Sequence, residues 1–212
     1  MPRDERKRQK ALMKKRSKQK AAGSHRSPQQ EFMPLSAQAI LRNARTFPVV
    51  ECLISADWKQ GSGLVQIILA RQQPDGDICF GVYLVDKYCL GLKNTFARTG
   101  FSRTRYENEF SDNIFHEEGS VECPLELAHQ MIYESIDYAA QFGFEPEKDF
   151  ASSQFLLAPR GELKEPYKLT FGQNGKPFFV AGPRDNVARI IKQLEKTAGP
   201  GNFDYIAPIV GF

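Results

Sequence analysis

The sequence predicts an α+β fold in which antiparallel β-hairpins pack with about three helices. Short apolar runs of strand length are separated by tight turns, and three segments carry apolar residues at helical spacing. Strands and helices do not alternate as they do in a doubly wound parallel sheet. Hydrophobic residues make up 41% of the 212-residue chain, which is enough for one packed core. We therefore expect a basic tail and linker over residues 1–34 and a single globular domain over 35–212.

The first part of the domain predicts a short helix followed by strands. Ser36 is a good N-cap for a helix over 37–44, and Pro48 separates this helix from the next segment. The segment 74–77 (PDGD) favours a tight turn, because proline fixes φ and glycine accepts a positive φ. This turn joins two apolar runs into a hairpin. The predicted strands are 49–56, 64–70 and 78–85.

The middle of the chain predicts a long loop and then a helix. Residues 94–122 show no sustained period and many polar groups, so we expect a loop there with at most one short helix. Residues 124–142 carry apolar side chains at helical spacing, begin with a proline and are followed by Gly143. These features predict an amphipathic helix that ends at the glycine.

The last part predicts a second hairpin, a final helix and a closing strand. An Asn-Gly pair at 174–175 favours a tight turn between strands at 168–171 and 178–181. Apolar residues at helical spacing predict a helix over 185–196, and residues 203–210 can form an edge strand.

Charge is distributed unevenly along the chain. Residues 1–26 hold eleven Lys or Arg against two acids, a net charge of +9, whereas the remaining 186 residues hold 18 basic and 23 acidic groups, a net of −5. The tail lacks an apolar face and should be disordered alone, although its residues favour a helix once phosphates neutralise their charge. Its affinity for nucleic acid would come from counterion release. The tail cations assigned to this role are Arg6, Lys7, Arg8, Lys10, Lys14, Lys15, Arg16, Lys18 and Lys20.

Two other interpretations of the tail remain open. It can act only as a solubilising segment that binds nothing specific. A helix on a membrane surface is a further option, but it needs large apolar residues on one face, and only Leu12 and Met13 are available.

A second candidate for nucleic-acid contact lies in the body of the protein. The stretch 87–106 contains five cations and no acid, and aromatic residues are interleaved with them. Cations neutralise phosphates and aromatic faces stack on unpaired bases, so this mixture suits single-stranded RNA. The alternative is a loop whose aromatic residues anchor it to the core. The cations concerned are Lys87, Lys93, Arg98, Arg103 and Arg105.

An enzymatic alternative centres on Asp86, Cys89 and Lys93, which could form a hydrolase-type site if they converge with a histidine. Cys123 precedes a predicted helix N-terminus, where a thiolate is stabilised. His116, Cys123 and His129 are separated by six and then five residues, which is not the spacing of structural zinc ligands, so we expect no metal.

Several functional classes are not expected. The sequence contains no phosphate-binding loop, dinucleotide-binding fingerprint, zinc-protease motif or nucleophile elbow, so no cofactor is predicted. No apolar run approaches the ~20 residues that cross a bilayer, and no secretory signal is evident. Four cysteines in this length do not form a disulfide scaffold. We therefore expect a cytoplasmic protein.

Three segments together resemble a family of bacterial proteins of unassigned function. They are LVDKYCLGLKN (84–94), ELAHQMIYESIDYAAQFGFEPEKDF (126–150) and NGKPFFVAGPRDN (174–186). The resemblance implies a bacterial, cytosolic protein with one compact domain after a basic tail. It implies no activity.

The sequence therefore predicts a non-enzymatic nucleic-acid-binding accessory protein, associated with RNA or the ribosome. The alternatives are the hydrolase-type enzyme and a protein-interaction module that docks through the acidic stretch 107–126.

Overall fold

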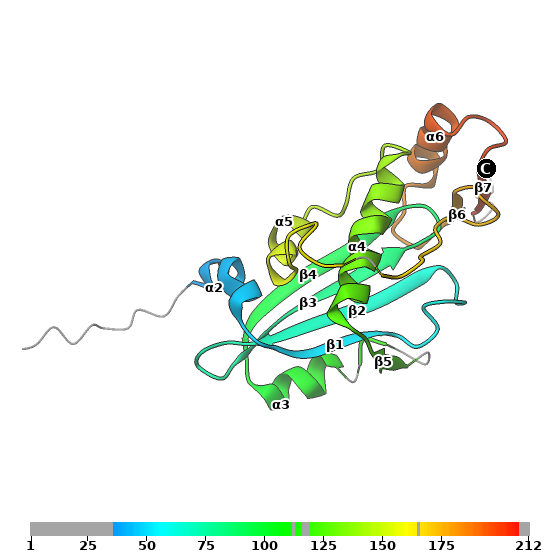
Figure 1. Cartoon of the computed structure of the whole chain (residues 1–212). Coiled ribbons are helices and arrows are strands. Elements are labelled where there is room, and N and C mark those ends of the chain that lie inside the picture. Colours follow the sequence, from blue (N-terminus) through cyan, green and yellow to red (C-terminus); the bar gives the residue numbers. More distant parts are fainter. Residues whose placement is uncertain (1–35, 112, 116–118, 165, 208–212) are drawn as a thin grey trace, which may run out of the picture. The chain divides into compact units, whose positions relative to one another are not determined.

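The computed structural model describes residues 36–111, 113–115, 119–164 and 166–207, and these form an α+β fold around a five-stranded antiparallel sheet (Figure 1). The predicted fold class is thus confirmed. The strand order is β4-β3-β2-β1-β5, so the first four strands are a meander in chain order and β5 joins the opposite edge. The strands are β1 (Val49–Ser55), β2 (Leu64–Gln72), β3 (Ile78–Asp86), β4 (Gly91–Phe101) and β5 (Ser120–Glu122).

The hairpin of β2 and β3 is the centre of the sheet and follows the predicted turn. Gly76 has φ of 93°, and the side chain of Asp75 accepts a hydrogen bond from the backbone N–H of Asp77 at 3.1 Å. This turn pairs Gln72 with Ile78, and the register then runs unbroken to the pair of Leu64 with Asp86. Both strands have a neighbour on each side in the sheet, and most of their residues are buried.

One face of the sheet is covered by the long helix α4 (Leu125–Ala140), together with shorter elements (Figure 1). Helix α4 begins after Pro124 and buries Met131 and Ile132 against the strand residues Ile67 and Tyr83. The same core takes in residues from the short helical elements that flank α4. These elements are α2 (Ala37–Asn43), η1 (Ala44–Thr46), α5 (Phe150–Ser153) and η4 (Gln154–Leu156).

The opposite face is covered at one end by an aromatic cluster around Phe80. The rings of Phe101, Tyr106 and Phe110 lie with their centroids 4.7 to 5.3 Å from that of Phe80. Two elements after β4 supply part of this cluster, namely α3 (Arg103–Tyr106) and the π-helical turn η2 (Glu107–Ser111). Such tilted and edge-on contacts stabilise an aromatic cluster by more than the burial of its apolar surface alone.

The C-terminal part forms a small third core. A two-stranded parallel sheet joins β6 (Phe178–Val180) to β7 (Asp204–Ile206), and α6 (Val187–Thr197) lies between them in sequence. Leu194 of α6 and Phe179 of β6 pack on Cys89, which lies in the turn between β3 and β4. The predicted helices over 37–44, 124–142 and 185–196 are confirmed as α2, α4 and α6 with slightly different ends. The structure adds the four-residue helices α3 and α5.

The predicted long loop over 94–122 is wrong. Residues 91–101 form β4, which pairs with β3, and α3, η2 and β5 follow. Strand β4 is an edge strand, where exposed polar residues such as Asn94 and Arg98 are tolerated. A register shift near Leu84 and Val85 further disturbs the alternation that reveals a strand.

The predicted hairpin between 168–171 and 178–181 is also wrong, although its turn exists. Asn174 and Gly175 both have positive φ, and Gln173 pairs with Lys176 across the turn. Residues 168–171 form no strand, and β6 pairs instead with β7 in parallel. The expected closing strand over 203–210 is present as the three residues of β7, and its last three positions lie outside the described residues.

Candidate functional site

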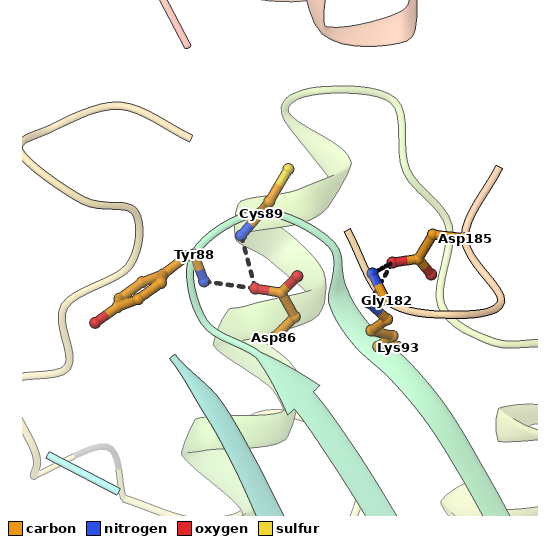
Figure 2. Close-up of polar contacts among 6 residues, drawn as sticks. All are labelled: Asp86, Tyr88, Cys89, Lys93, Gly182 and Asp185. Atoms are coloured by element: carbon orange, nitrogen blue, oxygen red, sulfur yellow. Dashed lines mark hydrogen bonds and ion pairs between the residues drawn. The ribbon is translucent and has the colours of Figure 1, made fainter. Parts of the chain in front are cut away.

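The turn between β3 and β4, with the strand ends on either side of it, carries the residues of the enzymatic alternative (Figure 2). Asp86 ends β3, and its Oδ1 accepts hydrogen bonds from the backbone N–H groups of Tyr88 and Cys89 at 2.9 and 3.0 Å. The carboxyl is buried, and this burial raises its pKa above the ordinary value for aspartate. The contacts therefore give Asp86 the role of holding the turn.

Cys89 follows in the same turn and is fully buried against the C-terminal core. Burial raises the pKa of its thiol, and the nearby Asp86 adds to the shift, so the nucleophilic thiolate is disfavoured. His129 is a buried residue of α4, and its helix neighbours Ala128 and Ile132 belong to a different core cluster from that of Cys89. His116 lies outside the described residues. The convergence of Asp86, Cys89 and a histidine that a hydrolase needs is not seen among the described residues.

Lys93 faces α6 rather than a catalytic partner. Its Nζ lies 2.5 Å from Oδ2 of Asp185, and the same carboxylate oxygen accepts the backbone N–H of Gly182 at 2.7 Å (Figure 2). Both side chains are largely shielded from water, so this ion pair ties the start of β4 to the segment that leads into α6.

The other predicted cations of the body lie at separate places. Lys87 is buried and donates from Nζ to the carbonyl oxygen of Trp58 at 2.9 Å, and burial lowers the pKa of its ammonium group. Arg98 is exposed, but its guanidinium lies over the ring of Phe96. Arg103 and Arg105 are exposed and form ion pairs one helical turn away, with Glu107 at 2.9 Å and Glu109 at 2.8 Å, respectively.

The aromatic residues of the stretch 87–106 point mainly into the protein. Phe101 and Tyr106 are buried in the aromatic cluster, and Phe96 is packed against it. The ring of Tyr88 lies beside that of Phe178. This stretch therefore combines anchored aromatic rings with cations that already have local partners. The nine predicted cations of the tail lie outside the described residues.

A groove of about 670 Å³ lies between the start of β4, the segment after α4 and α6. Beyond the Lys93–Asp185 pair, its lining includes three cations, Lys148, Arg184 and Arg189, and two acids, Glu145 and Glu147. Leu90, Leu92, Phe144 and Ile190 add apolar walls. The lining thus carries a small positive excess on a body whose own net charge is negative.

A basic face that was not predicted from the sequence lies on α6 and on the turn before it. We define the α6 basic face as the exposed residues Arg184, Arg189, Lys192 and Lys196. Among the described residues, none of these four side chains has an ion pair or hydrogen-bond partner. The signal was present in the sequence, because positions 189, 192 and 196 recur at helical spacing on the side opposite the apolar stripe that ends at Leu194.

A smaller cavity of about 210 Å³ lies beside α4 and is lined in part by His129, Tyr133 and Arg160. His129 is 3% exposed, and neither ring nitrogen has a hydrogen-bond partner among the described residues. Burial, assisted by Arg71, lowers the pKa of His129 to about 4, so the ring is neutral at physiological pH. Tyr133 donates to the carbonyl oxygen of Ala158, and Arg160 lies over its ring, so its hydroxyl already has a partner.

Neither a metal centre nor a membrane span is found in the described part of the chain. No three His, Cys, Asp or Glu side chains are grouped there as metal ligands would be. No helix there combines the length and apolar character needed to cross a bilayer. Comparison of the chain with protein-family models, curated proteins and solved structures finds no significant match. The resemblance to bacterial proteins of unassigned function therefore stays a prediction.

Proposed function

We propose that this protein binds nucleic acid, RNA in particular, through its cationic N-terminal tail and the α6 basic face. The observation that carries the proposal is charge segregation, with +9 in residues 1–26 and −5 in the rest of the chain. A polyanion is repelled by the body as a whole, so its affinity has to come from local concentrations of positive charge. The tail is the strongest of these.

The α6 basic face supports the proposal because its charges are free to meet phosphates. Arg103, Arg105 and Lys93 have acidic partners at 2.5 to 2.9 Å, and moving them to a phosphate would break these ion pairs. Arg184, Arg189, Lys192 and Lys196 lose no such partner within the described residues. Two of the four, Arg184 and Arg189, also line the groove, which brings phosphate-binding side chains next to apolar walls.

Binding of this kind depends steeply on salt and weakly on base sequence. Each phosphate that a Lys or Arg neutralises releases a condensed counterion, so log K falls with log salt by roughly 0.7 per contact for a single strand. Deletion of residues 1–26 should therefore flatten the salt dependence more than any change in the body. Contacts from α6 should account for a smaller part of the slope.

The test is fluorescence anisotropy with a labelled single-stranded RNA over a salt titration. Four proteins are compared: the full chain, the chain without residues 1–26, R189Q/K192Q and R103Q/R105Q. The two double variants remove the same formal charge, but Arg103 and Arg105 have acidic partners, whereas Arg189 and Lys192 have none among the described residues. We expect the truncated chain to lose most of the affinity. R189Q/K192Q should lower the salt slope by about 1 to 1.5, and R103Q/R105Q should stay close to the full chain.

The outcomes separate the parts of the proposal. Equal binding by the full and truncated chains, or no binding by either at low salt, contradicts the proposal. Equal losses in the two double variants would mean that α6 contributes only net charge, and the role of the α6 basic face would then be wrong.

A further inference from the structure

Two of the four free cysteines lie side by side at the edge of the sheet. Cys52 is in β1, and Cys123 directly follows β5, its neighbour in the sheet. The two Sγ atoms are 3.5 Å apart, and the backbone N–H of Cys123 donates to the carbonyl oxygen of Cys52 at 3.0 Å. The residues thus face each other one step beyond the register that pairs Leu53 with Glu122.

This placement is close to that of a disulfide. Facing residues on antiparallel strands have Cα atoms roughly 4.5 to 5.5 Å apart, which is within the range that disulfides span. Forming the S–S bond at about 2.05 Å requires the two sulfur atoms to approach by about 1.5 Å. Rotation of the cysteine side chains and a small shift of β5 can supply this movement, because β5 has only three residues, is exposed and lies at the sheet edge.

The two cysteines differ in a way that gives them separate roles. Cys52 is buried, whereas Cys123 is partly exposed and can meet a small molecule from solvent. The Cys52 thiol, when it donates to the Cys123 sulfur, lowers the pKa of Cys123 and raises its own. Cys123 also lies just before the first turn of α4, where a helix N-terminus favours a thiolate.

The remaining cysteines are not placed to form a disulfide. Cys79 and Cys89 are fully buried, and burial raises the pKa of both thiols, that of Cys79 to about 11. Neither sulfur lies within contact distance of another cysteine sulfur in the described structure, which includes all four cysteines. They therefore provide internal controls.

We propose that Cys52 and Cys123 form a reversible, redox-active disulfide, in which Cys123 reacts first with a low-molecular-weight disulfide and Cys52 resolves the product. The Cys123 thiolate attacks one sulfur of oxidised glutathione, forms a mixed disulfide and releases one glutathione thiolate. The Cys52 thiol then loses its proton, and its sulfur attacks Sγ of Cys123 and displaces the second glutathione thiolate. Two thiols of the protein are oxidised, one glutathione disulfide is reduced to two thiols, and the two cysteine protons pass to these products.

The test uses the full chain in buffers of reduced and oxidised glutathione. After equilibration, the protein is unfolded in denaturant so that buried thiols react too, its free thiols are alkylated, and it is analysed by intact mass and peptide mapping. We expect two alkyl groups on the oxidised protein instead of four, and linked peptides that contain Cys52 and Cys123. Once the added mass of the alkyl groups is subtracted, the oxidised protein should be two hydrogens lighter than the reduced one. Dithiothreitol should restore all four thiols, while Cys79 and Cys89 stay alkylated throughout.

Two variants test the order of attack. C52S should retain glutathione on Cys123, because no thiol remains to resolve the mixed disulfide. C123S should take up little glutathione at Cys52, which is buried. The circular dichroism of each variant shows whether it is folded, and the mapping of the unaltered chain needs no variant. The proposal is overturned if all four thiols stay reduced under oxidised glutathione, if the disulfide involves Cys79 or Cys89, or if the unaltered chain stops at a mixed disulfide.

Discussion

The guanidinium of Arg71 donates from Nε to the carbonyl oxygen of Leu156 at 2.9 Å, across 85 residues of sequence. Its NH1 group donates in addition to the carbonyl oxygens of Phe47 and Arg45, at 2.7 and 3.3 Å. The side chain is 5% exposed, and among the described residues no carboxylate forms an ion pair with it. Arg71 lies in β2, the middle strand of the sheet. From there its guanidinium donates hydrogen bonds to carbonyl groups of η1, of the residue after η1 and of η4.

Replacement of Arg71 should therefore lower the free energy of unfolding more than replacement of any exposed arginine. Arg71→Met keeps much of the volume but leaves three carbonyl oxygens without their donor, so we expect a loss of about 2–4 kcal/mol in the free energy of unfolding. Urea denaturation measures this loss. Arg98→Met removes an exposed arginine that lies over Phe96 and should stay within about 0.5–1 kcal/mol of the unaltered protein. Equal effects of the two changes would contradict the anchoring role of Arg71.

His129 should make the protein less stable in mild acid. Its pKa is about 4 in the folded protein, below the ordinary value of about 6.5 that applies to the unfolded chain. Between these values the unfolded chain binds the proton more readily, so stability is lost as the pH falls from about 6.5 towards 4, by up to about 3 kcal/mol. Urea denaturation at a series of pH values measures this slope.

The matched variant is His129→Leu, which cannot take up the proton. It should lack this part of the slope and be no less stable than the unaltered protein at pH 7, because neither ring nitrogen has a described hydrogen-bond partner to lose. An unchanged slope between pH 6.5 and 4 in the leucine variant would show that another group is responsible.

Gly91 is required where the start of β4 passes α4. Its φ is 66°, and a Cβ atom there would lie 2.5 Å from the carbonyl oxygen of Ser135 and 2.7 Å from Cβ of Ala139. Gly91→Ala combines left-handed strain with overpacking against helix backbone, so we expect a loss of about 3–5 kcal/mol in urea denaturation. Gly76→Ala is the control, because Gly76 also has a positive φ but open space around it, and it should lose only about 1–2 kcal/mol. Similar losses would mean that the contact with α4 can relax.

Two substitutions at Asp86 separate its hydrogen bonds from its charge. Asp86→Asn keeps an oxygen for the N–H groups of Tyr88 and Cys89 and removes a carboxylate whose pKa burial has raised. A raised carboxyl pKa means that the folded protein loses stability as the pH rises above the ordinary aspartate value, so Asp86→Asn should be at least as stable as the unaltered protein at pH 7.

Asp86→Ala removes the acceptor itself and should lose about 1–3 kcal/mol. Thermal unfolding of the two variants at pH 7 makes the comparison. If asparagine destabilises as much as alanine, the charge of Asp86 is needed for the fold, and its attraction to Lys93 then outweighs the cost of burial.

The elements that local chemistry determines were predictable from the sequence. The turn at 74–77, the apolar strands on either side of it and the amphipathic helix α4 each follow from residues close in sequence. Strand β4 was not predictable in the same way, because an edge strand carries polar residues and its register shifts near Leu84. The parallel pairing of β6 with β7 joins segments 26 residues apart in register, and a sequence pattern alone does not indicate such a partner.

The candidate sites also contain features that the sequence predicts and features that only the structure shows. The cations of 87–106 were identified from composition, but composition does not show that Lys87 is buried against Trp58 or that Arg103 has Glu107 as a partner. The α6 basic face could have been found from the spacing of its charges. The contact of Cys52 with Cys123 could not, because 71 residues separate them and only the sheet brings them together.

The order in which the sheet and its cover occur along the chain affects how the protein emerges during synthesis. The four-strand meander is complete at Phe101, whereas α4, which covers Ile67 and Leu69, begins only at Leu125 and ends at Ala140. A nascent chain that stops between these points has paired strands with an uncovered apolar surface, which is prone to aggregation. Holding chaperones then have to shield this surface until the helix has left the ribosome and can pack on the sheet.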